Sequence, residues 1–585
     1  MGIAVAATHE QDSTGSSTLP GGLVPAAIFC LAFGLRFAFL LQMRGTPMRD
    51  YAELPWQQWF IVDSAYYHQL ASSIAQGDLI APTAHFLSPL YCYFVGLVYA
   101  VFGVDLDGVR LAQCVIGSFS CVLLYWIGRQ TFSEIVGIVS GLCLAMYGLH
   151  IYYTEIILPT VLIVFLNLTF LLLVSIAPSK LTPARAAGAG MILGLAALAK
   201  ANALLLVGVT VAVLWWQHRK AGHRRFARLA LPLIVGTFLT IVPVTIHNYV
   251  VSGELVLITT TSGRNLLKGN GPAADGTHIQ LAPTLAGGHI KFYLDGDVKP
   301  DRAARQSREM VTLTLKHMAS QPIASAKLLV KKALLFLNVR ELFIRDNFYF
   351  AKRYSSVLSL PLPGFGLIGV LGLAGALWGL RRWESVAHVY AILLVQIASY
   401  TLVFVLARYR LVAVACLILF ASSFVSDVIQ IGVERRRGAF ALAVAVVLCC
   451  ALLVNIPFAE FPYERGFRDL SRRIERIQLE RHDSKLGLPT GREAPPAPPF
   501  KFSLTEGDLS DTGENAADME RPLSTPRSHV EEAEGARRDR FSGSRSFGSP
   551  RCEIVDAKTR SLRREGSRVL GSASTVADRW CLPEA

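Results

Sequence analysis

A carboxylate and two tyrosines share one helix face in the first polar segment after an apolar block. The run Asp63-Ser-Ala-Tyr-Tyr-His68 places Asp63, Tyr66 and Tyr67 at positions i, i+3 and i+4. A carboxylate held among aromatic rings is partly desolvated, which suits a general base for a hydroxyl nucleophile. The tyrosine rings could lie at a membrane surface or stack against the face of a sugar. The same spacing fits a helix-capping Asp63 on a solvated helix equally well.

A second carboxylate, Glu155, follows Tyr152-Tyr-Thr154 at the end of another apolar block. A carboxylate at this depth is costly unless it is paired or solvated in a cavity, so Glu155 is a candidate catalytic residue. Asp63 and Glu155 could share a divalent cation or a basic phosphate-binding residue. The alternative is a Glu155 side chain that merely extends to the membrane interface.

Basic residues suited to a lipid phosphate lie between apolar blocks. Arg408 and Arg410 flank Tyr409. A guanidinium binds phosphate oxygens in a bidentate manner and stays charged, and apolar helices on either side can hold an isoprenoid tail. Lys200 and Arg36 could face the same phosphate. For all four cations, anchoring or snorkelling at the membrane interface is the alternative.

The elements that must position these residues are membrane-spanning helices. Of the 585 residues, 52% are hydrophobic and only 17% are charged, against about 25% charged in a soluble domain. The apolar residues come in blocks of roughly 17–25, the length that crosses a bilayer. We expect an all-α polytopic protein of about eleven spans. The expected spans are Gly22–Met43, Arg110–Ile127, Ile135–Tyr152, Ile156–Ile176, Ala187–Ala199, Ala203–Trp216, Leu229–Ile246, Phe365–Leu380, Ala387–Leu406, Leu411–Ile429 and Ala439–Ile456.

Lysines and arginines in alternate short loops predict the orientation, because such residues concentrate on the cytoplasmic side. This pattern requires a cytoplasmic N-terminus and a Leu87–Phe102 segment that is re-entrant or interfacial. Counting that segment as a span would place every later basic cluster outside. Residues 44–109 and 247–364 then form two large external loops. The basic loops are those that contain Arg129, Lys180, Arg224, Arg381 and Arg436.

The remaining segments are polar. Residues 1–21 are expected to be a cytoplasmic N-terminus, 22–456 the membrane domain, and 457–585 a disordered tail. The tail is rich in Pro, Gly, Ser, Arg and Glu and cannot bury enough apolar surface to fold alone. Much of the net charge of +14 lies in the short loops between the apolar blocks. It therefore reports topology and does not indicate a nucleic-acid partner.

Six short motifs, in their order and topological positions, resemble the GT-C glycosyltransferases. The likeness is to the bacterial group related to protein O-mannosyltransferases and to the aminoarabinose transferase of lipid A, and it covers about residues 22–456. The motifs are Asp63-Ser-Ala-Tyr-Tyr67, Gly128-Arg-Gln-Thr-Phe132, Tyr153-Thr-Glu155, Leu198-Ala-Lys-Ala-Asn202, His247-Asn-Tyr-Val-Val-Ser-Gly-Glu254 and Arg408-Tyr-Arg-Leu411.

This resemblance implies a GT-C-like helical bundle that draws its sugar from a polyprenyl-monophosphate carrier. The transfer would invert the sugar configuration on the non-cytoplasmic face, and the acceptor would be a hydroxyl of a glycolipid, polysaccharide or protein. Asp63 takes the role of acceptor activation or metal positioning. Glu155 takes the second acidic position, and Arg408 or Arg410 the phosphate-binding position.

Two positions depart from the pattern of these relatives. Many relatives carry a second acidic residue directly after the first, where this chain has Ser64, which weakens a two-carboxylate metal site within that loop. His247 stands where relatives often carry Arg, which weakens its expected role in binding the lipid phosphate.

Two other classes of protein compete with a glycosyltransferase. A secondary transporter would place charges near the bilayer midplane and often shows repeated halves, whereas here the polar groups cluster at span ends. A non-catalytic subunit of an envelope assembly would not need Asp63. We expect a multi-pass protein of the bacterial inner membrane, with its active site facing the periplasm or exterior.

Overall fold

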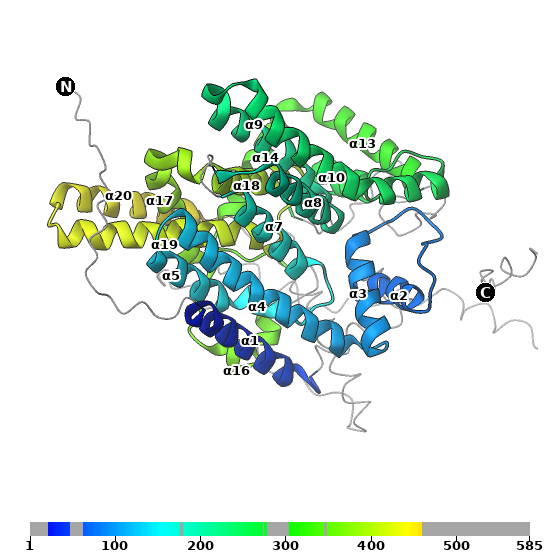
Figure 1. Ribbon diagram of the computed structural model, residues 1–585, viewed down its shortest axis with the longest axis horizontal. Coiled ribbons are helices and arrows are strands. Elements are labelled where there is room, and N and C mark those ends of the chain that lie inside the picture. The colour runs from blue at the N-terminus through cyan, green and yellow to red at the C-terminus, as the bar shows by residue number, and fades with distance from the viewer. Residues whose placement is uncertain are drawn as a thin grey trace, which may run out of the picture. The chain divides into compact units, whose positions relative to one another are not determined.

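The structure is a computed structural model that describes residues 22–46, 63–175, 180–272, 274–277, 303–343 and 348–458. The expected N-terminus, 1–21, and nearly all of the expected tail, 457–585, lie outside the described residues. All described residues fall in one compact unit, Met1–Pro496. Every regular element in that part of the chain is a helix, which confirms the all-α prediction (Figure 1).

Seven helical stretches among the described residues are long and apolar enough to cross a membrane. They are α1 (Leu23–Met43), α4 (Leu106–Thr131), η4 with α9 (Ala201–Leu204, Leu205–His218), α10 (His223–Ser252), α17 continuing through η7 into α18 (Phe365–Gly379, Leu380–Arg382, Trp383–Leu402), η8 with α19 (Ala407–Arg410, Leu411–Val433), and α20 (Arg437–Val454). Shorter apolar helices are α3 (Pro89–Phe102), α5 (Glu134–Ala145), α7 (Thr160–Val174) and α8 (Pro183–Ala199). Each expected span overlaps one of these helices.

The apolar segment expected to be re-entrant forms α3, which is shorter than a bilayer span requires. The Ser88 hydroxyl caps its N-terminus by accepting from the Tyr91 amide, with Pro89 in the first turn. Gly103 ends the helix in a left-handed conformation, with φ 87°. The Asp105 carboxylate then caps α4 two residues later. Local signals in the sequence thus separate α3 from the long span that follows.

The expected span Ile135–Tyr152 is interrupted in the structure. Helix α5 ends at Ala145, and the short α6 (Gly148–Tyr152) follows. Arg36 of α1, fully buried in the bundle, donates to the Ala145 carbonyl and to His150 Nδ1, at 3.4 and 2.6 Å. A carbonyl freed at a helix end needs a donor inside a membrane, and Arg36 provides one. Because its guanidinium is enclosed, Arg36 is not placed to meet a lipid phosphate.

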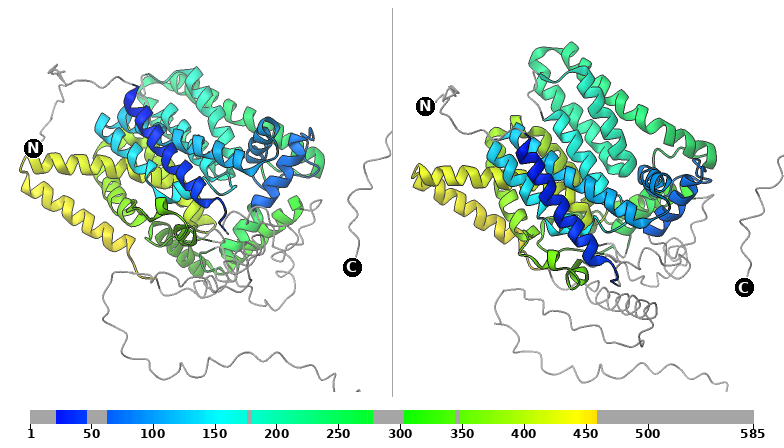
Figure 2. Two further views of the ribbon diagram at one scale, coloured as in Figure 1. Left: turned by 90° about the horizontal axis from the view of Figure 1, so that it is seen from below. Right: turned by 60° about the horizontal axis from the view of Figure 1, so that its bottom comes forward.

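The bundle is built around α19, whose residues from Leu411 to Phe420 are all buried. Helix α4 packs against α1, α5 and α7, and both views of Figure 2 show α1 running beside it. Helix α17 contacts α19 and α20, while few residues of α20 are buried. The interior therefore lies among α1, α4, α5, α7 and the N-terminal half of α19.

Glycines allow α8 and α10 to approach each other closely. A Cβ atom added at Gly190 of α8 would overlap the carbonyl oxygen of Leu233, and one at Gly236 of α10 would meet the Ala187 carbonyl at 2.6 Å. Because lipid is as apolar as the side chains, helices in a bilayer associate through such close packing of small residues. The contact holds α8, whose C-terminus leads to Lys200, against the long α10.

We predict that Gly190→Ala lowers the thermal stability of the detergent-purified protein by about 1–3 kcal/mol, the usual cost of overpacking. The matched control is Gly188→Ala in the same helix, where an added Cβ meets nothing within 4 Å. The two melting temperatures, followed by intrinsic fluorescence, should differ clearly, with the control at or slightly above wild type. Equal melting temperatures would show that the α8–α10 contact does not limit stability.

Candidate active site

Three distant segments bring a carboxylate and two cations together around Tyr409. Asp63 begins α2 (Asp63–Ala75), Lys200 follows the last residue of α8, and Arg408 and Tyr409 lie in η8. Arg408 Nη2 lies 3.3 Å from Asp63 Oδ2, across 345 positions of sequence. Lys200 Nζ lies 4.4 Å from the centre of the Tyr409 ring. The structure thus unites the expected base with two of the expected phosphate-binding residues.

The short helix η8 is held by contacts on several sides. The Tyr409 ring stacks on Tyr400 of α18, with ring centres 4.6 Å apart and an interplanar angle of 10°. The Ala407 amide donates to the Leu342 carbonyl at 2.8 Å. Asn202, two residues after Lys200, donates to the Ser399 hydroxyl at 2.9 Å. These contacts fix the orientation of Arg408 and connect it to the segment that carries Lys200.

A buried lysine joins the second large loop to the turn that leads into η8. Lys332 lies in α14 (Pro322–Leu337), and its ammonium donates to the carbonyls of Gly269 and Val403 and to Asn270 Oδ1, at 2.9, 3.0 and 2.7 Å. Burial lowers the pKa of Lys332 to about 8. All three donor positions of the charged amine have an acceptor, which explains how the cation is accommodated there. The sequence offered no signal for this contact beyond a lysine in an apolar run.

The site is polar and only partly exposed. The Asp63 side chain is 39% exposed and that of Arg408 is 15% exposed. One carboxylate and two cations meet around Tyr409, so a phosphate that enters here would meet two positively charged groups. A carboxylate can accept a hydroxyl proton, and a guanidinium can bind the phosphate that departs. The arrangement therefore suits transfer of a group from a phosphate to a hydroxyl.

Arg410 does not share this environment. Its guanidinium is 2% exposed, pairs with Glu341, and donates to the carbonyls of Asn338 and Arg340 at 2.6 and 2.9 Å. Burial raises the pKa of Glu341, an effect that Arg410 opposes. Residues two apart in a 3₁₀ helix point to different sides, so Arg408 reaches the site while Arg410 anchors the chain after α14. The expectation that Arg410 binds the lipid phosphate is therefore revised.

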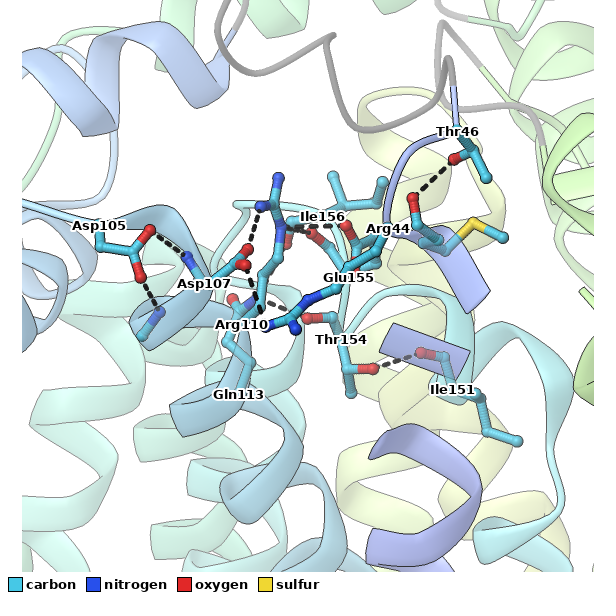
Figure 3. A network of polar contacts seen from close by, with 12 residues as sticks. Arg44, Thr46, Asp105, Asp107, Arg110, Gln113, Ile151, Thr154, Glu155 and Ile156 are labelled. Atoms are coloured by element: carbon cyan, nitrogen blue, oxygen red, sulfur yellow. Dashed lines mark hydrogen bonds and ion pairs between the residues drawn. The ribbon is translucent and has the colours of Figure 1, made fainter. Parts of the chain in front are cut away.

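Glu155 belongs to a different network from Asp63 (Figure 3). Its Oε1 lies 3.0 Å from Arg110 Nε, and both side chains are only 4% exposed. Arg110 also pairs with Asp107 at 2.8 Å, and Asp107 reaches Arg44 at 3.5 Å. Gln113 adds two bonds from its amide to the carbonyls on either side of Glu155, those of Thr154 and Ile156. The network fixes the turn after α6 to α4.

Sequence reasoning missed Arg110, although a signal for it was present. Asp107 and Arg110 are three residues apart at the start of α4, a spacing that places them on one helix face. An arginine at the end of a span, on the same expected side as Glu155, is the natural partner for a carboxylate at that depth.

The residues present do not fit the divalent cation that Asp63 and Glu155 were expected to share. Each carboxylate pairs with an arginine, Arg408 and Arg110 respectively. Among the described residues, no group of three or more His, Cys, Asp or Glu side chains is placed to hold a metal ion. A requirement for a divalent cation stays a prediction, and no step below is routed through one.

Tyr66 and Tyr67 hold the first large loop together. Their hydroxyls accept from the amides of Phe86 and Ser88, each at 3.4 Å. Tyr67 is almost fully buried and meets the Tyr91 ring edge-on at 4.7 Å. Burial, followed by the Asp63 charge, raises the pKa of Tyr67 above its ordinary value. Tyr67 is therefore a neutral structural group and is not placed to stack on a sugar, whereas Tyr66 is only partly buried.

His247 connects the two large loops. Its Nε2–H donates to the Ala81 carbonyl at 2.9 Å, because a carbonyl can only accept. Its ring lies 4.9 Å from that of His85. Burial and the neighbouring His247 lower the pKa of His85 to about 4. Asn248 adds bonds to the His85 amide and the Ile258 carbonyl. The structure gives His247 a role in joining the loops, and its expected contact with phosphate stays a prediction.

We predict that Glu155→Gln destabilises the protein by about 3–5 kcal/mol, the usual cost of removing one partner of a buried ion pair. Arg110 would keep the more exposed Asp107 carboxylate and the backbone carbonyl of residue 155, but it would lose its buried carboxylate. The double variant Glu155→Gln, Arg110→Met should recover part of the loss, because it leaves no uncompensated charge. Thermal unfolding of the three proteins measures this. A Glu155→Gln protein with wild-type stability would point back to a catalytic role.

Comparison with known proteins gives a family match over part of the chain. Residues 87–247 match the family described as dolichyl-phosphate-mannose-protein mannosyltransferase. The matched segment contains Glu155, Lys200 and His247 and lies between Asp63 and Arg408 in sequence. Comparison with curated proteins finds no match.

Solved structures of an archaeal enzyme show a distant likeness. The oligosaccharyltransferase AglB from Archaeoglobus fulgidus, in complex with an inhibitory peptide and a dolichol-phosphate, aligns with a TM-score of 0.39 at 13% identity, over 83% of this chain and 62% of that one. The A. fulgidus oligosaccharyltransferase complex with Zn and sulfate aligns with a TM-score of 0.39 at 12% identity, over 80% and 59%. This chain thus spans about three fifths of the length of these structures. The family match over residues 87–247 confirms the resemblance to GT-C membrane glycosyltransferases that the sequence motifs indicated.

Proposed function

We propose that this protein transfers a sugar from a polyprenyl-monophosphate carrier to a hydroxyl acceptor, with inversion at the sugar C1. The observation that carries the proposal is the Asp63–Arg408 pair at 3.3 Å, with Lys200 on the adjacent Tyr409 ring. One group suited to accept a proton and two suited to bind phosphate meet in one place. The family match, whose description names a dolichyl-phosphate-mannose donor, covers the segment that contains Lys200.

The reaction follows from the charges at the site. The acceptor hydroxyl gives its proton to the Asp63 carboxylate while its oxygen forms a bond to C1 on the face opposite the phosphate. The bond between C1 and the phosphate oxygen breaks, and its electron pair leaves with the polyprenyl phosphate. Arg408 and Lys200 stabilise the negative charge that develops on this leaving group. Attack from the opposite face inverts the configuration.

The Asp63–Arg408 pair also implies an order in which the two substrates are engaged. Without donor, the guanidinium is close to the carboxylate and Arg408 is largely enclosed. A donor phosphate competes for the same guanidinium and can bind it in a bidentate manner, whereas the Asp63 carboxylate makes a single contact at 3.3 Å. When Arg408 turns to the phosphate, Asp63 loses its partner and becomes available to the hydroxyl. The donor therefore binds before the acceptor is activated.

The side of the membrane and the acceptor class are part of the proposal. Basic residues in alternate loops support a site on the non-cytoplasmic face, which in a bacterial inner membrane is the periplasmic side. A partly exposed Asp63 supports a hydroxyl that arrives from water. A glycolipid, a polysaccharide or a protein hydroxyl would each meet this requirement.

We predict that Asp63→Asn lowers sugar transfer by about 10²–10⁴-fold, the contribution typical of a general base. The full-length protein would be reconstituted in proteoliposomes with radiolabelled polyprenyl-phosphate hexoses, and an envelope extract would supply acceptors. The matched control is Asp78→Asn, an exposed aspartate in the same external segment. Both variants should elute and melt as wild type does.

Each other outcome of that assay identifies a different class of protein. Equal transfer by wild type and Asp63→Asn would keep the enzyme class and discard the proposed base. Uptake of a solute by the proteoliposomes without any transfer would indicate a transporter. Activity that depends only on partner proteins, with Asp63 dispensable, would indicate an assembly subunit.

We predict that Arg408→Lys raises the donor KM by about tenfold or more and leaves the acceptor KM near wild type. Lysine keeps the charge but loses the bidentate geometry that matches a phosphate, and a hydrogen bond to a charged group is worth about 1.5–3 kcal/mol. Arg305→Lys is the control, since Arg305 is exposed on α13 (Ala303–Ser320) and pairs there with Glu309. An unchanged donor KM in Arg408→Lys would remove Arg408 from phosphate binding.

A further inference from the structure

A cavity of about 270 Å³ lies among the ends of α17, α18, α19 and α20. Its apolar wall includes Trp378, Phe420 and Phe424. Trp378 and Phe424 pack edge-on, with ring centres 5.8 Å apart. The cavity also has a polar rim, so it combines an apolar interior with charged groups at its edge. An amphiphilic ligand matches this combination better than a purely polar or a purely apolar one.

The cavity lies at the opposite ends of its helices from the candidate active site. Helix α18 begins at Trp383, next to the cavity, and ends at Leu402, in the turn that leads to Arg408. Twenty residues of α-helix extend about 30 Å, the thickness of the hydrocarbon core of a bilayer. Helix α19 likewise begins after Arg410 and ends beside Glu434 of the cavity rim. The rim is therefore at the level of lipid headgroups on the other membrane surface.

Cations outnumber carboxylates on the rim. Arg382 pairs with both oxygens of Asp427, at 3.3 and 3.2 Å, and Arg436 pairs with Glu434 at 3.5 Å. Arg381 is the third rim guanidinium, and it lies 4.6 Å from the Trp378 ring centre. The described residues place no carboxylate within ion-pair distance of Arg381. The rim of this aromatic cavity therefore carries three guanidinium groups and two carboxylates, an excess of one positive charge.

The turn between α19 and α20 adds to this positive edge. Arg435 adopts a left-handed backbone conformation, with φ 56°, which is uncommon for a residue with a side chain. This conformation reverses the chain and places Arg436 on the rim. On the α17 side, Gly375 and Gly379 line the cavity, and Gly375 lets α17 pack directly on α19, because an added Cβ there would overlap the Phe420 carbonyl oxygen.

We infer that this cavity binds the headgroup of an anionic phospholipid, with the phosphate at Arg381 and an acyl chain along the aromatic wall. Basic pockets between transmembrane helices at the cytoplasmic surface commonly bind such headgroups. The position at headgroup depth explains why charged and aromatic groups meet here. A lipid bound in this cavity would stabilise the packing of α17, α19 and α20 at the membrane surface opposite the candidate active site. The inference does not depend on the proposed reaction.

The test is lipid binding to the full-length protein in detergent, followed by native mass spectrometry. Phosphatidylglycerol, phosphatidylcholine and inorganic phosphate would each be titrated. Wild type should bind phosphatidylglycerol about tenfold more tightly than phosphatidylcholine. Arg381→Gln should reduce this preference to near equality. Arg305→Gln removes an exposed arginine elsewhere and should keep the preference.

Several results would overturn the inference. Equal binding of the two lipids by wild type, or an undiminished preference in Arg381→Gln, would show that the cavity does not select an anionic headgroup. Displacement of the lipid by millimolar inorganic phosphate would indicate a site for a free anion. Arg381 is exposed, so its replacement should not disturb folding, and Arg436→Gln is a second variant that should weaken the preference in the same direction.

Discussion

Buried cations in this helical bundle bind the carbonyl groups that helix ends leave without partners. A bilayer offers no water to a free carbonyl, so each such group must be satisfied within the protein. Arg36 donates to the last residue of α5, Lys332 to Val403 after the end of α18, and Arg410 to Asn338 after the end of α14. Helix C-termini carry partial negative charge, which favours a cation in each of these positions.

This arrangement separates the charges that hold the fold from those that are available for chemistry. The structural cations are enclosed and have backbone acceptors, and the buried Glu155 has Arg110. Asp63 and Arg408 differ because they meet each other at a partly exposed position. The helix breaks that the buried cations stabilise also help to place Arg408 beside Asp63, since only four residues separate the end of α18 at Leu402 from the start of η8 at Ala407. The buried cations that stabilise irregular backbone within the membrane thus also help to form the candidate site.

The two ends of α18 and α19 have different chemistry. At one end, a partly exposed carboxylate and two cations surround Tyr409. At the other, three arginines and two carboxylates edge an aromatic cavity. A single pair of helices, about one bilayer thick, connects them. Lipid bound at the second end would therefore stabilise the helices from which the first end is built.

The amino-acid sequence by itself determined the helices and the residues available for chemistry. Each span must be long, apolar and internally hydrogen-bonded, so span positions can be seen in the composition alone. The order of the motifs indicated a resemblance to GT-C glycosyltransferases, and Asp63 and Arg408 were both among the candidate residues. Which of two similar residues acts was decided only by packing: Arg408 and Arg410 are two positions apart, yet one faces Asp63 and the other is enclosed. The Glu155–Arg110 pair and the break in the span after Ala145 likewise depend on which helices are neighbours. Side-chain contacts between segments far apart in sequence arise from helix packing, which hydrophobic periodicity does not specify.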